Sequence, residues 1–238
     1  MNEFFLFISM KRDSFTDLNS SIYYTEINDA SEIENLKEFL HQEELKRFNS
    51  YTSDTRKQSF VLGRYCAKKA LQKYSNINIP SSIWIEPGVF NQPVIKAPNM
   101  GETKVSISHS RNAAIAAVYN ESHPMSVDIE QINASNRDSI YSQLTEREKS
   151  IVQLSGISNM DRILTTLWTA KECLGKVLTT GLTCDMKLFE IDTLVLNKDN
   201  VIECTFNNFI QYKTSSILYN DKLITILIPK RTNICLRN

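Results

Sequence analysis

Two acidic side chains, Asp128 and Glu130, stand two residues apart and alternate with the apolar Val127 and Ile129. Successive side chains on a β-strand point to opposite faces, so both carboxylates would project from the same face. Carboxylates held this close repel each other unless a cation lies between them or one takes up a proton. With no histidine or cysteine beside them, their oxygens suit a hard ion such as Mg²⁺. A solvent-facing strand edge would show the same alternation.

A third carboxylate, Glu172, lies in a segment with helical periodicity. Four leucines between positions 164 and 178 would share one buried side of that helix. Trp168, Glu172 and Lys176 follow one another at four-residue steps, which places them in one stripe along the edge of that side. The alternative for Glu172 and Lys176 is a surface ion pair, which stabilises a helix by only a few tenths of a kcal/mol.

A histidine at the end of a short strand is the third feature. Val105 and Ile107 would face one way, and Ser106 and Ser108 would face the other. His109 follows at the end of the strand, where a loop could offer its imidazole to a ligand. A polar strand end with a solvated histidine would look the same, because short motifs of this kind often arise by chance.

These residues need helices and strands to position them. The segment 31–48 has helical spacing of apolar residues, and Ser31 with Glu34 predicts a capping box. The polar turn at 120–124 predicts a boundary between an N-terminal half, 1–122, and a C-terminal half, 123–238. Helices followed by strands in each half predict an α+β fold, or α/β in a looser classification. The further expected helices are 53–74, 145–154 and 161–178, and the expected strands are a first strand near the N-terminus, 83–85, 105–108, 113–119, 125–130, 188–196, 201–206, 210–217 and 222–228.

Composition excludes several classes of protein. The 238 residues are 42% hydrophobic and 23% charged with a net charge of zero, which is typical of a globular protein and lacks the basic excess of a general nucleic-acid binder. No apolar run is long enough to span a membrane, and the first residues do not form a convincing signal peptide. The five cysteines are scattered without a CxxC pair, so neither a zinc site nor a disulfide framework is expected. We therefore expect a cytoplasmic protein that binds neither nucleic acid nor membrane.

Three segments, taken in order, resemble the motifs of a known family. They are Ser108-His109, the strand from Val127 to Glu130, and the helix that begins with Trp168 and carries Glu172 and Lys176. In this order they are similar to the 4′-phosphopantetheinyl transferases of the Sfp type. The resemblance covers about residues 41–190, and three motifs in sequence are far more specific than any one. It implies that family's fold, in which two similar αβ halves are related by pseudo-twofold symmetry within a monomer.

The resemblance also implies an activity. Members of the family are enzymes of the holo-[acyl-carrier-protein] synthase type, which use Mg²⁺ and take coenzyme A as donor. A serine hydroxyl of an apo acyl or peptidyl carrier protein would attack the β-phosphate of coenzyme A, and 3′,5′-ADP would leave. By similarity, Asp128, Glu130 and Glu172 would hold the metal. Lys176 would neutralise the developing charge, and His109 would hydrogen-bond a phosphate of coenzyme A.

Several roles stay open under this resemblance. The base that takes the serine proton is either Glu172 or Glu148, and the family's helix start matches Glu148 better than Glu146. Lys171 either reaches a phosphate or is only solvated, because lysine is a flexible point charge. Ser108 is expected among the residues that bind coenzyme A.

The 3′-phosphate of coenzyme A would take its cations from a basic helix. Arg56 is favoured over Lys57, because a guanidinium group can grip phosphate oxygens bidentately, and Arg64 is expected at the same site. The sequence departs from the family at two positions. Ser59 stands where relatives often have arginine, and Gln92 stands where relatives commonly have the lysine of Gly-Lys-Pro. Gln92 can hydrogen-bond a nucleotide but cannot neutralise a phosphate.

Two other functions would also fit a carboxylate cluster. One is a different Mg²⁺-dependent phosphotransferase or hydrolase without specificity for coenzyme A. The other is a coenzyme A-binding scaffold without catalytic activity, although such a protein would be expected to lose one of the three carboxylates or Lys176. The sequence does not distinguish among fatty acid, polyketide and nonribosomal peptide biosynthesis.

Overall fold

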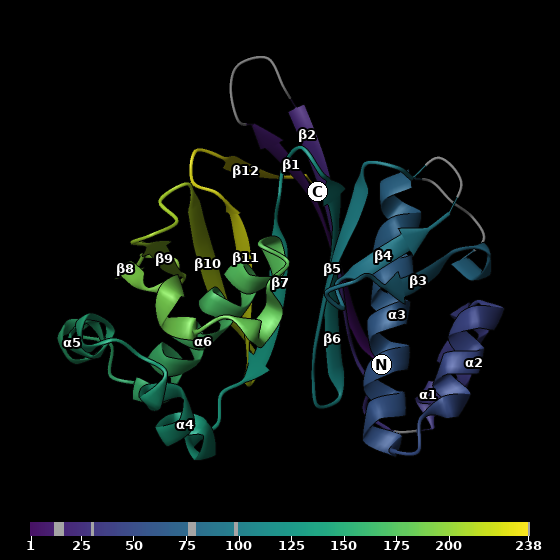
Figure 1. Cartoon of the computed structure of the whole chain (residues 1–238), viewed down its shortest axis with the longest axis horizontal. Helices are drawn as coiled ribbons and strands as arrows, with labels where there is room; N and C mark the ends of the chain where they lie inside the picture. The colour runs from purple at the N-terminus through teal and green to yellow at the C-terminus, as the bar shows by residue number, and fades with distance from the viewer. Residues whose placement is uncertain (12–16, 30, 76–79, 98–99, 238) are drawn as a thin grey trace. The chain divides into compact units, whose positions relative to one another are not determined.

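The computed structural model describes residues 1–11, 17–29, 31–75, 80–97 and 100–237. The chain divides into two compact units, which the ribbon shows with their strands and helices labelled (Figure 1). Unit 1 comprises Met1–Pro124 together with Thr232–Asn238, and unit 2 comprises Met125–Arg231. Within the described ranges, no helix is both long enough and apolar enough to cross a membrane.

Unit 1 is built on a five-stranded antiparallel sheet in the order β12-β1-β2-β6-β5. The sequence placed 232–238 in the C-terminal half, whereas β12 pairs with β1 in unit 1 because the edge of β1 offers it a complete row of backbone partners. A separate two-stranded hairpin, β3-β4, completes the unit's strands. The bounds are β1 Asn2–Lys11, β2 Asp17–Glu26, β3 Trp84–Pro87, β4 Pro93–Lys96, β5 Thr103–Ser110, β6 Ala113–Asn120 and β12 Asn233–Arg237.

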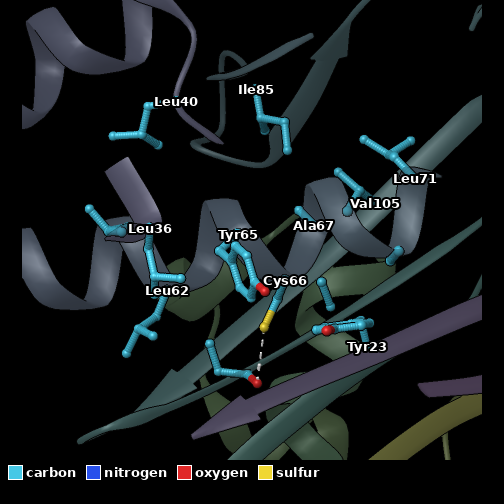
Figure 2. Close-up of a cluster of buried hydrophobic side chains, with 14 of the residues drawn as sticks. Tyr23, Leu36, Leu40, Leu62, Tyr65, Cys66, Ala67, Leu71, Ile85 and Val105 are labelled. Atoms are coloured by element: carbon cyan, nitrogen blue, oxygen red, sulfur yellow. Dashed lines mark hydrogen bonds between the residues drawn. The ribbon is translucent and has the colours of Figure 1, made fainter. Parts of the chain in front are cut away.

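The long helix α3, Asp54–Ser75, packs along β2, β5 and β6 and makes the core of unit 1. Figure 2 shows its buried side chains against the strands, with the Cys66 thiol directed at the backbone oxygen of Ala114. Tyr65 packs edge-on against Tyr23 of β2, with ring centroids 6.1 Å apart. The predicted helix 53–74 is therefore confirmed, and burial of its apolar side accounts for its position.

The predicted helix 31–48 is in fact two helices. α1 spans Glu32–Leu36, a short 3-10 turn follows at Lys37–Phe39, and α2 spans Gln42–Ser50. The capping box predicted at Ser31 and Glu34 is wrong, since Ser31 makes no side-chain cap. The box lies instead at the start of α2, where His41 accepts from the backbone of Glu43 and Glu44 accepts from the backbone of His41. The chain is extended at Leu40, which separates the two helices.

Unit 2 has a five-stranded antiparallel sheet in the order β7-β11-β10-β9-β8. Its long helix α6, Met160–Val177, packs on β7 and β11, and a second apolar core lies between helix and sheet. The predicted strand 188–196 begins with a 3-10 turn, Met186–Phe189, before β8. The other bounds are β7 Ser126–Gln131, α4 Arg137–Ser142, α5 Glu146–Leu154, β8 Ile191–Leu196, β9 Ile202–Phe206, β10 Tyr212–Tyr219 and β11 Lys222–Pro229.

The two units share a buried glutamate–lysine pair that no sequence repeat indicates. In each unit, a glutamate at the start of a short helix accepts a hydrogen bond from a lysine of the following long helix. Glu44 pairs with Lys68 at 2.6 Å in unit 1, and Glu148 pairs with Lys171 at 2.8 Å in unit 2. Each glutamate also accepts a hydrogen bond from a backbone N–H of the strand that follows the long helix, β3 in unit 1 and β8 in unit 2. An antiparallel sheet with helices packed on it in both units confirms the α+β class and the two similar halves.

Candidate active site

The predicted carboxylates come from two elements of unit 2 that pack against each other. Asp128 and Glu130 lie on β7, and Glu172 lies on α6. Val127 and Ile129 are fully buried in the sheet, as the alternation predicted. Asp128 is only 3% exposed, so its carboxylate lies between strand and helix and not on an outer edge.

The pKa of Glu172 is affected by the other two acidic groups. Burial, the largest cause, and the negative charges of Asp128 and Glu130 together raise the pKa of its carboxyl from 4.5 to about 7, against the lowering effect of the Lys176 charge. The three carboxyl groups lie on two elements that pack against each other, and the charges of Asp128 and Glu130 both contribute to the raised pKa of Glu172. The packing of α6 on β7 therefore brings the element that carries Glu172 against the strand of Asp128 and Glu130, which stand 44 and 42 positions before it in the sequence.

Lys176 is held beside the same carboxylates. Its ammonium group donates to Asp128 Oδ1 at 2.7 Å and to the backbone oxygen of Val127 at 3.0 Å. Burial alone would lower the pKa of Lys176, but the charges of Asp128 and Glu172 outweigh it and leave the pKa raised. The side chain is therefore a fixed cation within the acidic cluster, and its hydrogen-bond partner is Asp128.

A divalent ion fits this cluster by its chemistry. All three acidic side chains offer hard oxygen donors, and their mutual repulsion favours a bound cation. Among the residues that the structure describes, no three His, Cys, Asp or Glu side chains are already arranged as the ligands of one metal ion. In this arrangement the Asp128 carboxylate faces the ammonium group of Lys176. The acidic cluster therefore suits a divalent ion by the type of its donor atoms and by its negative charge.

Two residues predicted for catalysis or binding lie in the interior of unit 2. Glu148 is fully buried and caps the start of α5. Its Oε2 accepts hydrogen bonds from the Lys171 ammonium group and the Thr145 backbone, and its Oε1 accepts one from the Ile191 backbone. Lys171 is 1% exposed, and burial lowers its pKa against the opposing pull of Glu148. Both oxygens of Glu148 are therefore engaged, and the geometry is that of a buried structural ion pair. Trp168 is partly buried and packs against the core of unit 2.

Unit 1 contains a separate pocket of about 680 Å³. Its polar side is strongly basic and includes three arginines and His109, with serine and threonine hydroxyls between them. Such a lining suits an anionic ligand, because guanidinium groups bind phosphate oxygens well. The lining residues are Arg47, Tyr51, Ser53, Thr55, Arg56, Ser59, Phe60, Gly63, Arg64, Pro87, Asn91, Pro93, Ile107 and His109.

Aromatic rings and a carboxylate hold the arginines of this pocket. Arg56 lies over the ring of Tyr51 at 4.9 Å, and Arg47 donates to the Tyr51 hydroxyl at 2.8 Å. Arg64 lies over Phe60 at 4.6 Å and is 3.5 Å from Glu44, whose charge Lys68 already balances. Much of the positive charge is therefore left for a ligand.

A close approach of helix and strand shapes the floor of the pocket. A Cβ atom on Gly63 of α3 would lie 3.0 Å from the side chain of Ile107 on β5, so this position favours glycine. The contact brings α3 against the strand that carries His109, two residues further on. His109 is exposed and lies just inside the end of β5, next to Ser110.

Two predicted binding residues lie away from the pocket lining. Ser108 is buried on the opposite face of β5 from His109, as strand alternation requires. Gln92 folds back over its own turn, where its side-chain oxygen accepts from the backbone of Phe90 at 2.9 Å. Its neighbour Asn91 adopts a positive φ of 62° and lines the pocket instead.

Sequence reasoning missed Arg47 and Tyr51 at this pocket. Both lie at the end of α2 or just beyond it, where no motif distinguishes them from an ordinary amphipathic helix. The four-residue step from Arg47 to Tyr51 was the one usable signal, because it places the two on the same side of a helix.

Comparison with known families places both units in the same group. A model of the 4′-phosphopantetheinyl transferase superfamily matches residues 124–227. A model of the 4′-phosphopantetheinyl transferase N-terminal domain matches residues 44–119. The first range contains the acidic cluster, and the second contains every residue that lines the basic pocket. No curated protein matches the chain by sequence.

Two solved structures show a weaker likeness. A holo-(acyl-carrier-protein) synthase from Bacillus anthracis str. Ames in complex with CoA (3′,5′-ADP) is 20% identical, with a TM-score of 0.36, over 49% of this chain and 96% of that chain. The holo-[acyl-carrier-protein] synthase from Thermotoga maritima is 18% identical, with a TM-score of 0.33, over 56% of this chain and 72% of that chain. At this level of similarity neither neighbour assigns a residue or a ligand to the present chain.

Proposed function

The chain belongs to the 4′-phosphopantetheinyl transferase superfamily, and from this premise we propose that it transfers 4′-phosphopantetheine from coenzyme A to a serine of an apo carrier protein. The reaction would release 3′,5′-ADP, as in a holo-[acyl-carrier-protein] synthase. One observation carries the proposal: Asp128 and Glu130 of β7 and Glu172 of α6 lie on two elements that pack against each other within the matched family region. Lys176 lies against the same group.

The side chains of the acidic cluster are proposed to have three different roles in phosphoryl transfer. A Mg²⁺ ion bound by the three carboxylates would supply neutralisation of the charge that develops on the diphosphate. Lys176 presents a second, permanently fixed positive charge beside Asp128. Glu172, which lies on α6 four residues before Lys176, is proposed to accept the proton of the attacking serine. It is favoured over Glu148, whose two oxygens already accept from buried donors.

The basic pocket of unit 1 is proposed to take the nucleotide end of coenzyme A. Arg47, Arg56 and Arg64 line it with His109 and can pair with phosphate oxygens. Ser108, Gln92 and Lys171 are not part of this lining, so we do not assign them phosphate contacts in the present arrangement. The proposed partner is a folded acyl or peptidyl carrier domain, and we propose that the enzyme acts as a cytoplasmic monomer.

Arg56→Ala is expected to weaken the binding of 3′,5′-ADP about tenfold, because hydrogen bonds to charged groups are each worth roughly 1.5–3 kcal/mol. Isothermal titration calorimetry with purified protein measures the change. Lys57→Ala is the matched control, since Lys57 is the next residue of α3 but lies over the Phe48 ring outside the pocket lining. Equal affinities for the two variants would count against the pocket assignment.

Stability without metal is expected to fall as the pH rises from 4.5 to 7. The carboxyl of Glu172 has its ordinary pKa of 4.5 when unfolded and about 7 when folded, so the folded state binds more protons in this range. Raising the pH then costs up to about 3 kcal/mol of unfolding free energy. Mg²⁺ should restore stability more at pH 8 than at pH 5, because protons compete with it for the carboxylates.

Chemical denaturation at a series of pH values, with and without Mg²⁺, checks this. Glu172→Gln is the control, because its uncharged amide should remove both the pH dependence in this range and most of the response to Mg²⁺. A wild-type protein that responds to Mg²⁺ equally at both pH values would argue against a carboxylate-bound ion.

Mass spectrometry provides the direct test of transfer. The protein is mixed with coenzyme A, Mg²⁺ and several apo carrier domains, and phosphopantetheine addition to the carrier is expected only while Mg²⁺ is present. Binding of coenzyme A without addition to any carrier would favour the scaffold alternative. Mg²⁺-dependent turnover of other phosphate compounds without affinity for coenzyme A would favour a different phosphotransferase or hydrolase.

A further inference from the structure

A buried hydroxyl group joins the two elements that carry the acidic cluster. Ser126 of β7 is 1% exposed, and its Oγ donates to the backbone oxygen of Cys173 on α6 at 2.8 Å. Ser126 stands two residues before Asp128, and Cys173 directly follows Glu172. The hydrogen bond therefore ties strand and helix together beside the acidic residues that each one supplies.

A second buried contact lies on the neighbouring strand. Thr169 of α6 and Thr225 of β11 are both fully buried, and their hydroxyl oxygens are 2.7 Å apart. Thr225 stands directly opposite Asp128 in the pairing of β7 with β11. Ser216 of β10 extends the contact, with its hydroxyl 2.8 Å from that of Thr225. The helix is thus held to the sheet at two points near Asp128, one two residues before it on β7 and one opposite it on β11.

We propose that Ser126 and Thr169 are positioning residues for the acidic cluster. They fix the position of α6 along β7, so that Glu172 and Lys176 stay opposite Asp128. Apolar packing alone is non-directional, whereas a hydrogen bond specifies distance and angle. A misplacement of about 1 Å in a catalytic site can cost about a hundredfold in rate. The inference rests on the proposed function, and it concerns the two hydrogen bonds that would hold the acidic cluster in place.

Unit 1 supplies an internal comparison. Ser21 of β2 donates to the backbone oxygen of Ala70 on α3, which repeats the contact of Ser126 with Cys173. Two residues after Ser21 stands Tyr23, and the residue before Ala70 is Lys69, so neither position carries an acid. The hydrogen bond in unit 1 therefore has the same packing role but no carboxylates of this kind to position.

The pair Ser126→Ala and Ser21→Ala separates packing from positioning. Both variants lose one buried hydroxyl, so similar decreases in melting temperature are expected. Ser126→Ala should also bind Mg²⁺ about tenfold more weakly in calorimetry and transfer more slowly, which is the usual scale for losing a supporting contact at a metal site. Ser21→Ala should keep the Mg²⁺ affinity and the rate of the unaltered protein.

Thr169 provides a second test should Ser126→Ala not fold. Thr169→Val keeps the shape but removes the hydroxyl, whereas Thr169→Ser keeps the hydroxyl. We expect weaker Mg²⁺ binding in the valine variant and recovery in the serine variant. Unchanged Mg²⁺ affinity in Ser126→Ala and Thr169→Val would overturn the positioning role. An unaltered protein that neither binds Mg²⁺ nor transfers would overturn the proposed function itself, and this inference with it.

Discussion

Asp128→Asn is expected to lower the rate of transfer by about a thousandfold while the protein stays folded. The substitution removes a charge from the acidic cluster, and loss of metal-assisted charge stabilisation costs several kcal/mol of barrier. Asparagine keeps the volume of the side chain and an oxygen that can accept from Lys176, so the packing between β7 and α6 should survive. Steady-state kinetics with an apo carrier measures the rate, and circular dichroism checks the fold.

Asp199→Asn is the matched control for this variant. Asp199 is an exposed acid in the turn between β8 and β9, outside both the acidic cluster and the basic pocket. The control should transfer at the rate of the unaltered protein. A folded Asp128→Asn protein that turned over normally would remove Asp128 from the metal site and would leave the proposed mechanism without its central ligand.

Lys171→Met is expected to destabilise unit 2 by about 3–5 kcal/mol, the usual cost of removing one partner of a buried ion pair. Lys171 and Glu148 are almost completely buried, and the ammonium group of Lys171 donates to the carboxylate of Glu148 at 2.8 Å. The backbone donors of Thr145 and Ile191 would remain, but they carry no full charge. Urea denaturation followed by fluorescence measures the loss.

Lys149→Met tests whether burial is the cause. Lys149 pairs with Glu146 on the same helix at 2.7 Å, but the Glu146 side chain is 89% exposed, so the loss should stay within about 0.5 kcal/mol. A second comparison replaces both buried partners, as in Lys171→Met with Glu148→Met, and should recover part of the stability. A loss below 1 kcal/mol in Lys171→Met would mean that the pair is hydrated in solution.

Local patterns predicted the elements that carry the acidic cluster. The alternation of Val127 and Ile129 with acids gave β7, and the leucine spacing gave α6 within one residue at each end. Glu148 was harder to place, although Thr145 three residues before it is a recognisable capping signal. That signal indicates a structural role, and only the fold reveals Lys171 beside the same carboxylate.

Long-range contacts account for what the sequence did not predict. The pairing of β1 with β12 joins segments more than 200 residues apart, and nothing local in 233–237 indicates its partner. The repeated Glu44–Lys68 and Glu148–Lys171 pairs were equally hidden, because the flanking residues differ. The basic pocket gathers residues from α2, α3 and three strands, so its arginines could be proposed one by one but not assembled.

The pairing of β12 with β1 also bears on how the chain folds. Unit 2 is an uninterrupted stretch, so it can fold as soon as residues 125–231 have left the ribosome. The sheet of unit 1 is completed only by residues 233–237, which arrive after all of unit 2 has been synthesised. During that interval the outer edge of β1 is open to other strands. The length of that interval is set by the synthesis of unit 2, whose own edge strands come from one uninterrupted stretch of chain.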